Sequence, residues 1–266
     1  LLAVAAALVA CGVFHLFRLR FESGDVYPAY SSLRTDPLGT MAFYEALGDL
    51  PGITVARDFQ NVNRLPAGRG TAYLHLAARS YDWRWLPEEL FDEIDRYVRN
   101  GGRLVIAFHP EPVRPHQFAT AAGGTPPPPK KGAGGGPKPD EPPEGYVRLS
   151  DRWGLELTHV PLDSDDGESY APVEAEKVAD LPLPEAISWH SGVVLTNVEP
   201  AWDTIYQRGT NPVAVERRTG RGTIVVATDS YFLSNEALRK EPQAELLAWL
   251  VAPAGQVVFD EAHFGI

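Results

Sequence analysis

Two apolar segments separated by one amphipathic segment constrain the fold of this chain most strongly. Residues 72–77 (AYLHLA) have the composition of a strand, and residues 104–108 (LVIAF) form an apolar run typical of a strand buried on both faces of a parallel sheet. Residues 87–100 begin with proline, carry glutamates in the first turn and end at Gly101-Gly102, which predicts a helix. Together they form a βαβ unit, whose right-handed crossover places the two strands parallel in one sheet.

The other segments extend this unit into a larger sheet. Residues 223–228 (TIVVAT) again have buried-strand character and are expected to form a hairpin with residues 213–216. Further strands are expected at 53–57, 193–196, 204–207 and 256–259, and further helices after Asp36-Pro37 and after Ser234 or Asn235. This order predicts an α/β fold with an open, mostly parallel sheet and an antiparallel hairpin addition.

Residues 110–145 interrupt the pattern of strands and helices. They contain a four-proline run at 126–129 and then the sequence GAGGGPKP, with few apolar side chains to bury. A proline-rich recognition tract is one interpretation, but such a composition by itself mainly indicates a flexible insertion. We therefore expect one α/β domain over residues 35–266, interrupted by a disordered insertion at 110–145 and preceded by a linker at 20–34.

The first 17 residues, LLAVAAALVACGVFHLF, are apolar apart from His15. A membrane-spanning helix needs roughly 20 apolar residues, with about 17 as the lower limit. A signal peptide is one alternative, but the run ends in a poor cleavage site, and a buried core helix would show a polar face. We therefore expect a single-pass transmembrane anchor at residues 1–19. Arg18 and Arg20 favour a cytoplasmic domain, although long domains can translocate regardless of such charges.

Composition and missing motifs exclude several classes of function. The formal net charge of −11, without a cluster of Lys or Arg, argues against nucleic-acid binding. Cys11 is the only cysteine and lies in the apolar N-terminal run, so the folded part has no thiol for a disulfide, a zinc–thiolate site or a nucleophile. No phosphate-binding loop precedes the DEAH segment at 260–263, and no GxSxG motif occurs. We expect neither a cofactor nor a bound metal ion.

Polar side chains follow several predicted strands, at the edge where ligands bind in open α/β sheets. Arg79, Ser80 and His109 follow the two strands of the βαβ unit. The carboxylates and the histidine after 223–228 and 256–259 could bind a metal or act as an acid/base pair, although such groups also serve as helix caps. The candidate ligand-binding residues are Ser31, Ser32, Arg34, Asp229, Ser230, Asn235, Asp260, Glu261 and His263.

Four segments of the chain resemble the bacterial family named domain of unknown function 4350. They are YSSLRTDPLGTMAFYEAL, GITVARDF, GRGTIVVATDSYFLSNEAL and VVFDEAHFG, and the resemblance covers about residues 30–109 and 146–266. Gln243 departs from the Asn that is usual in the family. The positions that carry the resemblance are Gly39, Thr40, Gly220, Gly222, Asp229, Leu233, Ser234, Asn235, Leu238, Asp260, Glu261, His263 and Gly265.

The resemblance implies a class I glutamine-amidotransferase-like fold with a flavodoxin-like sheet. It also implies membrane segments flanking a domain outside the cytoplasm, and an association with MoxR-type ATPases. Amidotransferases of this class use a Cys-His-Glu triad, which a chain with Cys11 alone lacks.

These observations favour a non-catalytic binding or scaffolding domain, tethered to the membrane, with a protein partner in a cell-envelope complex. A sugar or a peptide is one alternative class of ligand. The other alternative is a hydrolase-like or metal-assisted enzyme that uses Asp260, Glu261 and His263. It predicts that these side chains and Asp229 converge in one cleft.

Overall fold

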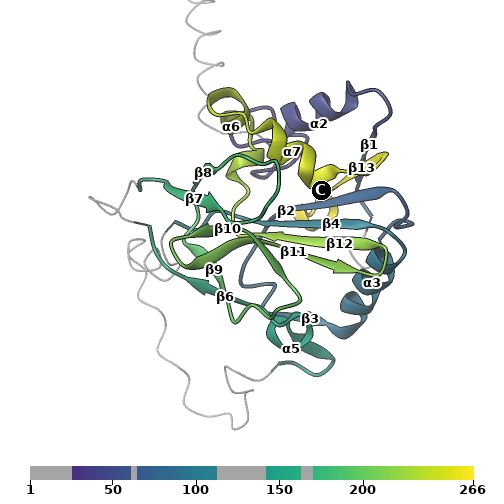
Figure 1. Cartoon of the computed structure of the whole chain (residues 1–266). Helices are drawn as coiled ribbons and strands as arrows, with labels where there is room; N and C mark the ends of the chain where they lie inside the picture. Colours follow the sequence, from purple (N-terminus) through teal and green to yellow (C-terminus); the bar gives the residue numbers. More distant parts are fainter. Residues whose placement is uncertain (1–25, 61–64, 113–141, 163–169) are drawn as a thin grey trace, which may run out of the picture.

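The computed structural model describes residues 26–60, 65–112, 142–162 and 170–266 (Figure 1). Of these residues, 22% are helical and 34% lie in strands. The helices are α2 (Met41–Gly48), α3 (Glu88–Arg99), α5 (Leu149–Trp153), α6 (Asn235–Lys240), α7 (Ala244–Val251) and the 3₁₀ turns η2 (Tyr231–Leu233) and η3 (Ala262–Phe264). The strands are β1 (Thr54–Asp58), β2 (Thr71–Ala78), β3 (Trp85–Pro87), β4 (Arg103–Phe108), β5 (Tyr146–Arg148), β6 (Glu156–His159), β7 (Val173–Lys177), β8 (Ala186–Trp189), β9 (Val193–Thr196), β10 (Asp203–Arg208), β11 (Asn211–Thr219), β12 (Gly222–Ala227) and β13 (Gln256–Asp260).

One mixed sheet of nine strands organises the molecule. Its order is β1-β13-β2-β4-β12-β11-β10-β7-β8, and the pairs β3-β5 and β6-β9 form two small separate sheets. The strands from β1 to β12 in this order are parallel, and each later pairing is antiparallel. The predicted βαβ unit is present as β2, α3 and β4, with Leu74 paired to Val105 in the parallel register.

The predicted fold class is wrong, because the sheet is not mostly parallel. We expected a flavodoxin-like or amidotransferase-like, mostly parallel sheet, whereas half of the pairings in the nine-stranded sheet are antiparallel and strand residues outnumber helical ones. The strands that sequence analysis missed include β7 (VEAEK) and β8 (AISW), which lack an apolar run. Buried and more exposed residues alternate along both strands, as in an antiparallel edge covered on one face only.

The nine-stranded sheet has a hydrophobic core on each face. Successive residues of a strand point to opposite faces, so Leu74 packs in one core and Tyr73 in the other. The core of Leu74 includes apolar residues of α2 and α7, and the core of Tyr73 includes those of α3 and α5. Figure 1 shows α2, α6 and α7 on one side of the sheet and α3 and α5 on the other.

Two of the glycines that carry the family resemblance have structural roles in the turn between β11 and β12. Gly220 has a φ of +62°, a left-handed conformation that glycine adopts readily. A Cβ atom on Gly222 would lie 2.0 Å from the carbonyl oxygen of Gly102, so only glycine fits where β12 begins beside β4. This G-x-G segment therefore serves strand packing.

No helix in the described part of the chain is both long and apolar enough to cross a bilayer. The prediction of a membrane-anchored, single-pass protein is therefore wrong for the described residues. The predicted anchor at residues 1–19 and most of the predicted insertion, residues 113–141, lie outside them. Within the predicted linker at 20–34, Tyr30, Ser31 and Ser32 are buried, so this part of the linker belongs to the folded domain.

Candidate functional site

A hollow of about 730 Å³ lies beside β2, on the face of the sheet that α3 covers farther along. Its volume is in the range of small-molecule sites. Its apolar lining includes Leu65, Trp83, Leu86, Leu90, Ile94 and Leu104. Its polar lining consists of Tyr73, His75, Arg79, Asp82, His109, Glu111, Asp260 and His263.

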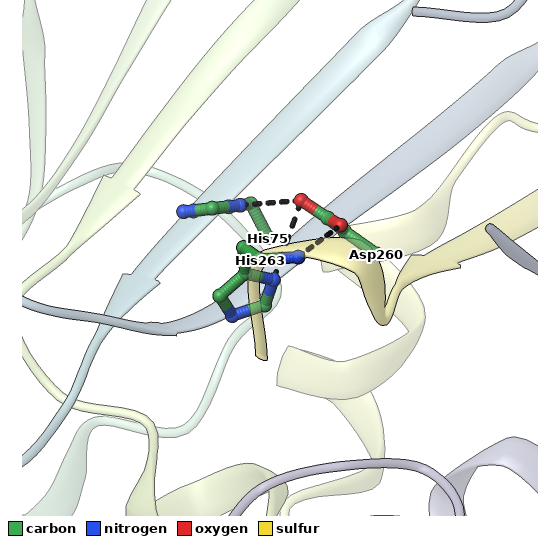
Figure 2. Close-up of side chains that lie close together, drawn as sticks. All are labelled: His75, Asp260 and His263. Atoms are coloured by element: carbon green, nitrogen blue, oxygen red, sulfur yellow. Dashed lines mark hydrogen bonds and ion pairs between the residues drawn. The ribbon is translucent and has the colours of Figure 1, made fainter. Parts of the chain in front are cut away.

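Three of the polar side chains meet in one cluster, which Figure 2 shows. His75 projects from β2, Asp260 is the last residue of β13, and His263 lies in η3. Because β13 and β2 are parallel neighbours with Phe259 paired to Leu74, Asp260 and His75 lie side by side on the same face. Nδ1 of His75 is 2.6 Å from Oδ2 of Asp260, and Nδ1 of His263 is 3.3 Å from the same oxygen.

The hydrogen bonds of His263 define the protonation of its ring. Nε2 of His263 lies 2.8 Å from the carbonyl oxygen of Leu76, and since a carbonyl only accepts, Nε2 carries a proton. In the neutral ring, Nδ1 then carries a lone pair. This buried Nδ1 has no hydrogen-bond partner among the described residues, and it faces the carboxylate of Asp260. Nδ1 of His263 and Oδ2 of Asp260 are therefore two hydrogen-bond acceptors that face each other, unless a proton or another cation lies between them.

The charges of Asp260 and His75 follow from their surroundings. Burial alone would raise the pKa of Asp260, but the adjacent rings of His263 and His75 hold it well below its usual range. Burial lowers the pKa of His75, and this effect outweighs the opposing effect of Asp260. At neutral pH, a neutral His75 therefore donates its Nδ1–H to an ionised Asp260. Figure 2 shows the other ring nitrogen of His75 pointing away from Asp260.

Glu261 follows Asp260 in the chain but belongs to a different set of contacts. Its Oε2 accepts a hydrogen bond from Oγ of Ser31 at 2.6 Å. Its Oε1 accepts two from Ser32, from the backbone N–H at 2.7 Å and from Oγ at 2.6 Å. Arg57 in turn donates its Nε–H to Oγ of Ser32 at 2.7 Å. These contacts attach the segment before α2 to β1 and to the end of β13. Both carboxylate oxygens of Glu261 are engaged in them.

Arg34 and Asn235 also have structural partners. Arg34 forms a two-point ion pair with Asp36, with both N–O distances at 2.6 Å. Oδ1 of Asn235 accepts a hydrogen bond from the backbone N–H of Ala42 at 2.9 Å, and its Nδ2 donates to the carbonyl of Asp36 at 2.7 Å. These two predicted ligand-binding residues therefore hold α2, α6 and the preceding loop together.

Asp229 and Ser230 follow β12 and join several strand ends. Oδ1 of Asp229 accepts the backbone N–H of Tyr231 at 2.7 Å, and its Oδ2 accepts that of His190. Burial raises the pKa of Asp229 to about 7, despite the opposing effect of these backbone hydrogen bonds. Oγ of Ser230 accepts the N–H of Ala77 at 3.0 Å and donates to the carbonyl of Phe108 at 2.9 Å. Neither residue is among those that line the hollow.

Of the nine predicted ligand-binding residues, the structure brings only Asp260 and His263 into the hollow. It adds His75, which sequence analysis did not select. The signal for His75 was a lone polar side chain within the apolar run 72–77, on the strand that neighbours the one carrying Asp260.

Comparisons with solved structures give only distant likenesses. An exo-β-1,4-mannosidase, Op5Man5 from Opitutaceae bacterium strain TAV5, is 15% identical with a TM-score of 0.33, over 63% of this chain and 23% of that one. A β-galactosidase from Bacillus circulans sp. alkalophilus is 14% identical with a TM-score of 0.36, over 66% and 23%. The mmIFT52 N-terminal domain is 12% identical with a TM-score of 0.39, over 76% and 79%. This chain thus matches under a quarter of either glycosidase, and scores this low identify neither fold nor activity.

No curated protein matches the chain. A family model described as "Domain of unknown function (DUF4350)" matches residues 31–251. This match includes β2, β4 and β12, and it ends before β13, which carries Asp260.

Proposed function

Since the chain belongs to the DUF4350 family of domains of unknown function, we propose a function from its own geometry: it binds a small molecule in the hollow beside β2. The observation that carries this proposal is one hollow that combines a mainly apolar wall with the cluster of His75, Asp260 and His263. Apolar pockets with a few convergent polar groups are the usual form of small-molecule sites.

The lining indicates the shape of the ligand. Trp83, Leu86 and Leu90 would contact an apolar ring or chain, which gains by leaving water. The polar end of the same ligand would face Asp260 and His75. Recognition of both ends by fixed groups would provide specificity, because a ligand without the polar end would cover these polar groups without forming hydrogen bonds to them.

This proposal keeps the non-catalytic binding role that the sequence favoured. The family resemblance implies an assembly with a MoxR-type ATPase. A protein partner of this kind stays a prediction.

A hydrolase-like or metal-assisted enzyme is the second candidate, and the pair of His75 and Asp260 favours it. A carboxylate that orients a neutral imidazole is a common form of general base. The version predicted from the sequence also needed Glu261 and Asp229 in the cleft, but both are used by structural hydrogen bonds. Hydrolysis of a test substrate that is lost in His75→Gln and kept in His109→Gln would favour the enzyme over the binding domain.

A fragment screen by ligand-observed NMR tests the binding role. Leu90 lines the hollow from α3 and is partly exposed, so Leu90→Trp should fill space there. Leu50 is 49% exposed and does not line the hollow, which makes Leu50→Trp the matched control. We expect ring-containing fragments to bind the wild type and Leu50→Trp alike, and to bind Leu90→Trp at least about tenfold more weakly. Equal binding to the three proteins would reject the hollow as the site.

A further inference from the structure

We propose that His75, Asp260 and His263 bind one divalent transition-metal ion, of the class of Zn²⁺, and that this ion receives the polar end of the ligand in the hollow. The inference rests on the proposed binding function and adds a metal to it. It departs from the expectation, based on the sequence alone, that no metal is bound.

The cluster has the donor atoms and the spacing of a metal site. One ligand atom from each of the three residues lies within 4.8 Å of the other two. Two ligands at about 2.0–2.1 Å from a tetrahedral Zn²⁺ are about 3.3 Å apart. Nδ1 of His263 and Oδ2 of Asp260 are already 3.3 Å apart. Nδ1 of His75, at 2.6 Å from Oδ2, would move away by about 0.7 Å when the ion takes the place of the Nδ1 proton, and the neutral ring would then carry its proton on Nε2.

The second ring nitrogen of His263 provides an independent indication. Metal-binding histidines almost always donate their other ring N–H to a carboxylate or a backbone carbonyl, which fixes the tautomer that binds the metal. Nε2 of His263 makes this hydrogen bond to the carbonyl of Leu76 at 2.8 Å. It leaves Nδ1 unprotonated in the neutral ring, buried, and facing Asp260 with no hydrogen-bond partner in the described part of the chain.

The burial of Asp260 also fits a site for a cation. Its side chain is 0% exposed, whereas those of His75 and His263 are 12% and 13% exposed. Within the described residues, Asp260 is paired with these two histidines and with no lysine or arginine. A buried carboxylate without a cation is strongly unfavourable, so a bound cation would stabilise this arrangement.

The ligand set selects the class of ion. Two imidazoles and one carboxylate suit Zn²⁺, Co²⁺ or Fe²⁺, whereas Ca²⁺ and Mg²⁺ require mainly oxygen ligands. Three protein ligands leave at least one coordination position open. Since His75, Asp260 and His263 all line the hollow, that position would be reachable by the polar end of a bound molecule.

Metal titration of the untagged full chain, stripped of metal with a chelator, tests the proposal. We expect one Zn²⁺ per chain by calorimetry, and visible ligand-field bands of low-coordinate Co²⁺ that Zn²⁺ removes. His75→Ala and His263→Ala should each weaken Zn²⁺ binding by about 100-fold or more. His190→Ala, which removes a histidine outside the hollow, should bind as the wild type does.

Several results would overturn the metal site. One is a wild-type chain that takes up no stoichiometric Zn²⁺ and gives no Co²⁺ bands, which would mean that a protonated His263 alone neutralises Asp260. Another is unchanged affinity in His75→Ala and His263→Ala, which circular dichroism would show to be folded. The wild-type Co²⁺ spectrum decides the question even if both variants fail to fold. Fragment binding measured with chelator present separates the two proposals, because the hollow can bind fragments in the absence of any metal.

Discussion

Oε1 of Glu261 accepts two hydrogen bonds from Ser32, at 2.7 Å from its backbone nitrogen and at 2.6 Å from its Oγ, although 229 positions separate the two residues. Ser31 donates a third hydrogen bond to the same carboxylate. The DEAH segment is thereby divided: Asp260 and His263 line the hollow, whereas Glu261 holds the segment before α2 against the sheet.

Glu261→Ala should destabilise the fold without removing the site in the hollow. The substitution leaves two buried hydroxyls and a buried N–H without their acceptor, so we expect the free energy of unfolding to fall by about 2–5 kcal/mol. Urea unfolding measures the loss. Fragment binding by the molecules that remain folded should be unchanged. A loss below about 0.5 kcal/mol would contradict the structural role of Glu261.

Arg103 should be a second centre of stability. Its Nε–H donates to the carbonyl of Leu250 at 2.7 Å, and Nη1 donates to Oε1 of Glu216 at 2.6 Å and to Oγ1 of Thr223 at 2.7 Å. Arg103→Met leaves the carboxylate of Glu216, a residue only 8% exposed, without its partner. We expect a loss of about 3–5 kcal/mol in urea unfolding. The double variant with Glu216→Leu should regain part of it, and additive losses would show that the two side chains are not coupled.

Gly222→Ala should lower the stability of the fold, whereas Gly48→Ala should not. The new Cβ would lie 2.0 Å from the carbonyl oxygen of Gly102, so β12 would have to move away from β4, and we expect a loss of about 1–3 kcal/mol. Gly48 ends α2 with no atom within 4 Å of a Cβ placed there. Gly48→Ala is therefore the control, expected to be neutral or to stabilise by up to about 1 kcal/mol. Thermal unfolding distinguishes the two, and equal effects would contradict the close contact.

The titration of Asp229 should make stability depend on pH. Burial raises the pKa of this carboxyl in the folded chain to about 7, whereas in the unfolded chain it is about 3.9. Protons bind more tightly to the folded state, so the contribution of Asp229 to stability is full below about pH 4 and is lost as the pH rises through about 7.

The comparison with Asp229→Asn isolates this effect, because Asn does not titrate. Relative to the variant, the wild type should lose a few kcal/mol of unfolding free energy between about pH 4 and pH 7, and little more above pH 8. Urea unfolding of both proteins at a series of pH values gives this difference. A difference that stays constant with pH would show that the pKa of Asp229 is not raised.

The sequence predicted the part of the fold that hydrophobic patterns encode. The apolar runs at 72–77, 104–108 and 223–228 correspond to β2, β4 and β12, and the amphipathic segment at 87–100 corresponds to α3. The strands β7 and β8 were missed because antiparallel strands that are covered on one face only carry polar residues at alternate positions and no continuous apolar run. Missing them made the sheet seem mostly parallel.

The site was predicted in part, for a related reason. Asp260 and His263 stand directly after a strand, where the sequence suggested a ligand. His75 lies within a strand, and only the parallel pairing of β2 with β13 places it beside Asp260. Asn235 and Glu261 have the residue types of ligand-binding groups, but they have partners 201 and 230 positions away, and no local pattern shows such contacts. Arg34 instead pairs with Asp36, two positions along the chain.

Crystallographic fragment screening of the full chain tests the central claim, that the hollow beside β2 is the binding site, most directly. The account predicts fragments whose rings lie against Trp83 and Leu90 and whose polar ends point to the cluster of His75, Asp260 and His263. The claim would be contradicted if fragments bind at other surfaces and none binds in the hollow.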